Sequence, residues 1–176
     1  RGEGGGPFGP PRPASDEDDD ARGIDPNKPL YLRAENTVTR DTGFYRLADL
    51  SGGAPAQKLL LGAKSYRTAA KAKNADVVVI TAQTFDEEPN LHLTNATFSA
   101  PKQVTEANPQ KAGLLWGKGE LISFKNVDGV PLQAALYKPD NFDPNKKYPL
   151  MIYIYERLSQ TVHNFNAPRP GHSVNP

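Results

Sequence analysis

Residues 146–155 read KKYPLMIYIY, and positions 150–155 are six apolar or aromatic residues without a break. A run of this kind predicts a strand that is covered on both faces, as in the sheets of α/β proteins. Such sheets need helices on both sides, and no segment with a helical apolar stripe follows before Pro176. We therefore expect this strand to belong to a larger layered fold than the sequence can complete, cut out of something longer at both ends.

The stretch just before this run predicts a hairpin. Residues 119–139 read GELISFKNVDGVPLQAALYKP, in which apolar and polar positions alternate on both sides of Asp128-Gly129. An Asp-Gly pair between two alternating runs is a strong short-range hairpin signal, because glycine readily takes the positive φ that the turn needs. Trp116, just upstream, is the single large anchor expected in the connector 105–119.

The sequence pattern of residues 25–118 predicts many short strands. The expected strands, separated by glycine and proline turns, lie within 29–35, 43–50, 57–62, 75–85 and 90–98. Residues 65–75 lack a convincing apolar stripe, so a strand or loop is favoured over a helix there. Strands spaced by about ten residues are typical of sandwiches, barrels or propeller blades, and the overall fold class is expected to be mainly β.

Residues 1–24 are dominated by glycine, proline and acids, and we expect them to be disordered because they cannot bury enough apolar area to offset their ordering entropy. The acidic run 16–20 lacks the alternating ligands and the glycine of a calcium loop, which favours a solvated tail. The net charge of +1 gives no electrostatic reason to expect nucleic acid. No apolar run approaches a membrane span, and the absence of cysteine excludes disulfides and thiolate metal sites.

From about residue 71 onward the sequence resembles the prolyl oligopeptidase family of serine peptidases, close to its dipeptidyl-peptidase and acylaminoacyl-peptidase branches. The resemblance is carried by FDEEPNLHL, PKQVTEANPQ, LLWGKGELISF and DGVPLQAALYKPDNFDPNKKYPLMIYIYE. It implies a β-propeller that caps an α/β-hydrolase domain. The implied organisation is a disordered segment over 1–24, about two propeller blades over 25–118, and the truncated start of the hydrolase domain over 119–176.

The resemblance also implies a site residue. In this family a tyrosine at the end of the early hydrolase strand donates its hydroxyl to the oxyanion of the tetrahedral intermediate, and Tyr155 occupies the matching position. The alternative is an aromatic side chain that caps the strand. Where many members have glycines, this chain has Glu156 and Arg157. These two residues either contact a substrate terminus or form a solvated pair.

The Ser/Asp/His triad is implied to lie outside this sequence. The nearest approach to a G-x-S-x-G elbow is Gly171 to Asn175 around Ser173, which ends in asparagine and follows prolines rather than a strand. The sequence has three histidines, His92, His163 and His172. His163 and His172 could form a metal pair, but no further ligand lies at a spacing typical of a metal site, so no metal or other cofactor is expected.

These patterns lead to one functional hypothesis and one alternative. The hypothesis is a fragment of a serine peptidase that hydrolyses short peptides, inactive by itself because the triad is missing. The alternative is a non-enzymatic β-rich interaction module. The expected partner is a peptide substrate of the full-length parent, and the resemblance slightly favours a periplasmic or extracellular location. Peptide specificity and oligomeric state stay open.

Overall fold

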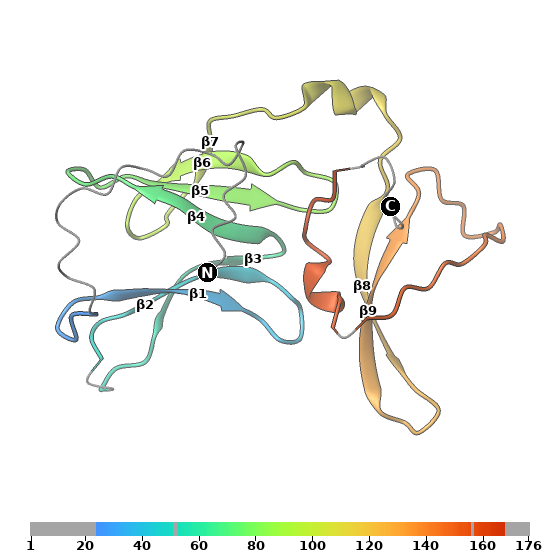
Figure 1. Ribbon diagram of the computed structural model, residues 1–176, viewed down its shortest axis with the longest axis horizontal. Helices are drawn as coiled ribbons and strands as arrows, with labels where there is room; N and C mark the ends of the chain where they lie inside the picture. The colour runs from blue at the N-terminus through green and yellow to red at the C-terminus, as the bar shows by residue number, and fades with distance from the viewer. Residues whose placement is uncertain (1–23, 51–52, 156, 168–176) are drawn as a thin grey trace, which may run out of the picture.

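A computed structural model describes residues 24–50, 53–155 and 157–167, and these residues are mainly β (Figure 1). The strands are β1 (Leu30–Glu35), β2 (Thr42–Leu47), β3 (Gln57–Gly62), β4 (Ser65–Lys71), β5 (Val78–Gln83), β6 (Asn90–Thr94), β7 (Lys102–Gln103), β8 (Lys118–Lys125) and β9 (Pro131–Lys138). Two 3₁₀ turns, η1 (Pro109–Gly113) and η2 (Ser159–Thr161), are the only helical elements of the described residues. The mainly β fold class is confirmed.

The nine strands form three antiparallel sheets in chain order. Strands β1-β2-β3 make the first sheet, β4-β5-β6-β7 the second, and β8-β9 a two-stranded hairpin. Figure 1 shows the first two sheets beside each other and the hairpin set apart at the C-terminal side. The prediction of a strand or loop over 65–75 is confirmed, since β4 occupies most of it.

The main core lies between the first two sheets. Its buried members are Phe44 on β2, Val78 and Ile80 on β5, and Phe98 in the loop after β6. The rings of Phe44 and Phe98 stack with centroids 4.3 Å apart. Every second residue of β5 is buried because successive side chains of a strand point to opposite faces, and the face that carries Val78 and Ile80 packs into the core.

Thr42 provides a buried polar tie between these two sheets. Its hydroxyl donates to the carbonyl of Lys64 and accepts from the backbone N–H of Tyr66, both at 2.8 Å. The side chain is nearly fully buried, so its polar atom needs these partners. The start of β2 is thereby fixed against the start of β4.

The predicted hairpin is confirmed in β8 and β9. Gly129 adopts a φ of +80°, which suits a residue without a Cβ. The side-chain Oδ1 of Asn126 accepts from the backbone N–H groups of Asp128 and Val130 at 3.0 and 2.8 Å. The turn is therefore held by Asn126 as well as by the Asp-Gly pair.

A second, smaller apolar contact attaches the hairpin to the second sheet. The rings of Phe85 and Tyr137 lie 4.5 Å apart, and a Cβ on Gly119 would stand 3.1 Å from both side chains and 3.2 Å from the carbonyl of Val162. Phe85 and Val162 are buried. This contact lets the segment 157–167 pass between the second sheet and the hairpin (Figure 1).

The predicted buried strand at 150–155 is not present. Residues 149–155 form no strand and pair with no other strand of the described residues, and the six side chains at 150–155 are 60–86% exposed. No strand edge of the described residues pairs with this segment, so it lacks the ladder of hydrogen bonds that completes a strand. The apolar side chains that were predicted to be buried are exposed to solvent.

Two further expectations fall largely outside what the structure describes. The disorder predicted for 1–24, including the acidic run, concerns residues that lie outside the described part except for Ile24. Within the described part, no helix has the length and apolar content needed to cross a membrane.

Candidate functional site

Tyr155 lies at the end of the exposed apolar segment. Its side chain is 62% exposed and has no hydrogen-bond partner among the described residues. Glu156 lies outside the described residues. Arg157 is exposed, and its backbone carbonyl accepts a hydrogen bond from Nε2 of Gln160. The structure thus places Tyr155 and Arg157 on an open surface, where their proposed roles remain predictions.

The turn between β1 and β2 is held by several hydrogen bonds. Oδ1 of Asn36 accepts from the backbone N–H groups of Val38 and Thr39 at 2.8 and 3.1 Å. The backbone of Asn36 also bonds Arg40 and Asp41 at 2.9 and 2.8 Å. Together these bonds hold Arg40 at a φ of +63°, a left-handed conformation that few side chains adopt unaided.

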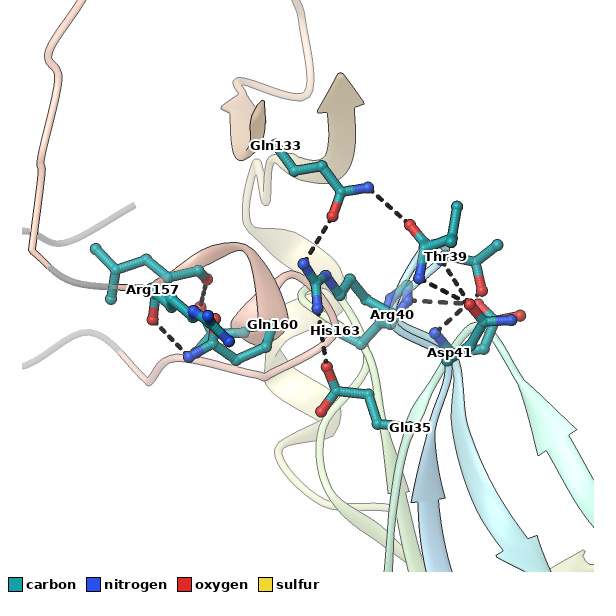
Figure 2. Close-up of polar contacts among 12 residues, drawn as sticks. Glu35, Thr39, Arg40, Asp41, Gln133, Arg157, Gln160 and His163 are labelled. Atoms are coloured by element: carbon teal, nitrogen blue, oxygen red, sulfur yellow. Dashed lines mark hydrogen bonds and ion pairs between the residues drawn. The ribbon is translucent and has the colours of Figure 1, made fainter. Parts of the chain in front are cut away.

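Arg40 reaches from this turn to the hairpin (Figure 2). Its Nη2 donates to Oε1 of Gln133 on β9 at 2.7 Å, and its Nη1 donates to Oε1 of Glu35 at 3.4 Å. Nε2 of Gln133 donates in return to the carbonyl of Val38 at 2.8 Å. Gln133 therefore bonds both the side chain and the backbone of the turn, which joins the first sheet to the hairpin. We call Glu35, Arg40, Asp41, Gln133 and His163 the polar junction.

His163 completes the polar junction from the C-terminal side (Figure 2). Its Nε2 lies 3.8 Å from Oδ1 of Asp41, an ion pair only when the imidazole is protonated. Nε2 of His163 and Nε of Arg40 are buried without a hydrogen-bond partner among the described residues. The polar junction therefore brings together three chain segments but leaves two buried nitrogens unpaired.

Sequence reasoning missed the polar junction. Arg40 and Gln133 are 93 residues apart, and Gln133 occupies a strand position where any outward polar residue would fit. The unusual feature of Arg40 is its left-handed backbone conformation. Arginine is not one of the residues that mark turns in a sequence, so this conformation could not be predicted.

Trp116 is an anchor, as the sequence predicted. Its indole N–H donates to the carbonyl of Phe85 at 3.0 Å, and its ring stacks on Phe165 with centroids 5.2 Å apart. The ammonium of Lys111 lies 4.7 Å from the Trp116 centroid and 5.0 Å from that of Phe165. This cluster ties the connector between β7 and β8 to the C-terminal segment.

Among the described residues, the histidine that lies beside a carboxylate is His163, next to Asp41. His92 is half-buried on β6, as expected for a strand residue, with Nδ1 3.1 Å from the carbonyl of Asn90. His172 and Ser173 lie outside the described residues. Burial raises the pKa of Tyr66 and of Tyr137, and a hydrogen bond to Thr161 partly opposes the rise at Tyr137. Within the described part, no group of three or more metal-binding side chains is close enough to hold an ion.

The chain is similar to curated proteins over part of its length. It is 34% identical over 73 residues to "Probable dipeptidyl-aminopeptidase B" of Ajellomyces capsulatus, covering 39% of this chain and 8% of that protein. It is 44% identical over 36 residues to dipeptidyl peptidase 8 of Mus musculus, covering 20% and 4%. The dipeptidyl-aminopeptidase B of Aspergillus terreus matches at 28% over 127 residues, covering 72% and 12%. These partial relatives are dipeptidyl peptidases, and the chain spans about a twelfth of the length of the first of them.

The fold also resembles part of a solved structure. A variant of the AtxE2 isopeptidase superposes with a TM-score of 0.55 at 16% identity, covering 76% of this chain and 20% of that one. At this identity the likeness concerns the fold alone. No protein-family model matches the chain.

Proposed function

We propose that this chain is the junction between the β-propeller and the α/β-hydrolase domain of a serine peptidase of the prolyl oligopeptidase family. Residues 25–118 would supply propeller blades and residues 119–176 the start of the hydrolase domain. The partial likeness to dipeptidyl peptidases supports the peptidase origin. The likeness to the isopeptidase fold over 76% of this chain supports the β-rich arrangement.

The observation that carries the proposal is the extended segment that ends at Tyr155. Six apolar side chains at 150–155 are exposed to solvent. They follow the β8–β9 hairpin, which the bond between Gln133 and Arg40 fixes to the first sheet. A segment of that composition is typical of a strand that a larger sheet and its covering helices enclose. The same exposure disfavours the alternative of a self-contained interaction module, which would enclose these side chains itself.

Within the complete enzyme, Tyr155 would donate its hydroxyl to the oxyanion of the tetrahedral intermediate. A donor of this kind acts mainly on the transition state, so its removal lowers kcat more than it changes KM. Arg157 and Glu156 follow directly and would lie near the bound peptide. The peptide substrates of the dipeptidyl peptidases are thus the proposed substrates of the complete protein.

The chain by itself should not hydrolyse peptides. We expect residues 1–176 to give no turnover of a chromogenic dipeptide amide. Turnover that disappears in Ser173→Ala would contradict the proposal, because it would show a nucleophile within this sequence.

The role of Tyr155 needs a longer polypeptide that joins this sequence to a hydrolase segment with a G-x-S-x-G serine. There Tyr155→Phe should lower kcat by about 10²–10³-fold with KM little changed. Tyr153→Phe is the matched control, since Tyr153 lies on the same segment and is also exposed. Equal kcat values for the two variants would remove Tyr155 from the mechanism.

A further inference from the structure

An acidic cleft lies between the second sheet and the hairpin, and neither Tyr155 nor the residues of the polar junction line it. It has a volume of about 540 Å³ and is bordered by β6, the loop after β5, and the connector between β7 and β8, which Figure 1 shows crossing to the hairpin. The charged side chains that line it are Asp86, Glu87, Glu88, Glu106, Lys111, Lys118 and Asp140. Five acidic residues and two lysines line the cleft, so the lining favours a cationic occupant.

Glu88 is the unusual member of this lining. Only 7% of the residue is exposed, and its carboxylate has no hydrogen bond or ion pair among the described residues. Its neighbours are engaged: Glu87 pairs with Lys64, and Asp86 accepts from the hydroxyl of Thr84 at 2.7 Å. The carboxylate oxygens are not among the fully buried, unpaired atoms of the described residues, so the carboxylate opens to the cleft and can accept hydrogen bonds from an incoming cation.

Lys111 does not fill this role. Its ammonium donates to the carbonyl of Asp86 and lies over the rings of Trp116 and Phe165. It is thereby held at the aromatic side of the cleft. The carboxylate of Glu88 is left for a cation that comes from outside the described chain.

We propose that the cleft binds a guanidinium group, as carried by an arginine side chain of a peptide or protein. A guanidinium keeps its charge at all working pH values and presents five donors in a planar fork, which suits several carboxylates spread around one cleft. It is also more weakly hydrated than an ammonium, so it enters a half-buried site at lower desolvation cost. Glu88 would supply the bidentate contact at the base of the cleft.

Binding in this cleft can be followed through Trp116, which is the single tryptophan of the chain and lines the cleft. Argininamide added to the full chain should shift the Trp116 indole N–H resonance in a saturable manner. Citrullinamide, which has the same shape without the charge, should not shift it. Equal shifts from the two compounds would overturn the proposal.

The variant Glu88→Gln separates binding from folding. If the carboxylate has no partner of its own, the glutamine variant of the free chain should melt at the same or a higher temperature and lose the argininamide response at least tenfold. Glu120→Gln is the control, since Glu120 pairs with Lys138 outside the cleft, and it should keep the response. A lower melting temperature for Glu88→Gln would contradict the proposal by showing a structural partner for this carboxylate. A retained response in that variant would contradict it as well.

Discussion

Nη2 of Arg40 donates a 2.7 Å hydrogen bond to Oε1 of Gln133, and this contact joins a turn of the first sheet to the hairpin 93 residues later. Gln133 returns a second bond to the carbonyl of Val38. The two bonds cross from one sheet to another, so they fix the hairpin relative to the turn rather than stabilising either element alone.

Gln133→Ala should therefore weaken the polar junction. It removes the bond from Nη2 of Arg40 and the bond to the Val38 carbonyl, while Arg40 keeps Glu35, and hydrogen bonds to charged groups contribute about 1.5–3 kcal/mol. Urea unfolding should show a loss of that order. Gln110→Ala is the control, because Gln110 is exposed and bonds only Asn108 two residues away. Equal losses for the two variants would show that the junction contributes little.

Gly43 is predicted to be intolerant of any side chain. A Cβ at this position would stand 1.9 Å from the carbonyl oxygen of Leu60, closer than any real contact. Gly43→Ala should therefore break the pairing of β2 with β3, and far-ultraviolet circular dichroism should show a lower melting temperature. Gly113→Ala is the matched control, since nothing lies within 4 Å of its Cβ position. A Gly43→Ala variant as stable as the control would contradict the close approach.

The exposed segment should control self-association but not folding. Ile154 is 86% exposed, whereas Ile80 is fully buried in the main core. Ile154→Lys should leave the unfolding free energy nearly unchanged and reduce association measured by sedimentation, because charges block the pairing of open apolar segments. Ile80→Ala should instead lower stability by about 2–5 kcal/mol. Unchanged association in Ile154→Lys would mean that other surfaces drive it.

Alkaline pH should test the burial of Tyr137. Burial raises its pKa above the ordinary value near 10, so the folded state keeps the phenol proton longer than the unfolded state does. Its contribution to stability is complete below about pH 10 and is lost as the pH rises through the higher folded value. Between pH 9 and about 11, Tyr137→Phe should lose less stability than the unsubstituted chain. Tyr31→Phe, at an exposed position, should follow the unsubstituted curve. Parallel curves for all three proteins would indicate that Tyr137 is solvated.

Sequence reasoning located the strands well where local patterns decide them. The alternation in 57–62 and 90–98 led to β3 and β6, and Asp128-Gly129 led to the β8–β9 turn. It missed the two-residue strand β7 and both 3₁₀ turns, which are too short to show a period. It also missed the polar junction and the buried Glu88, because each depends on residues far apart in the chain.

The sequence by itself determined which segments are extended and where the hairpin turns, since alternation and turn residues act over a few neighbouring positions. Only the tertiary structure decided which extended segments become paired strands and which polar groups meet. Residues 149–155 have the composition of a buried strand, yet they stay unpaired and exposed in the described chain. The physical reason is that a strand is completed by hydrogen bonds to another edge, and the position of that edge is not encoded in the strand itself.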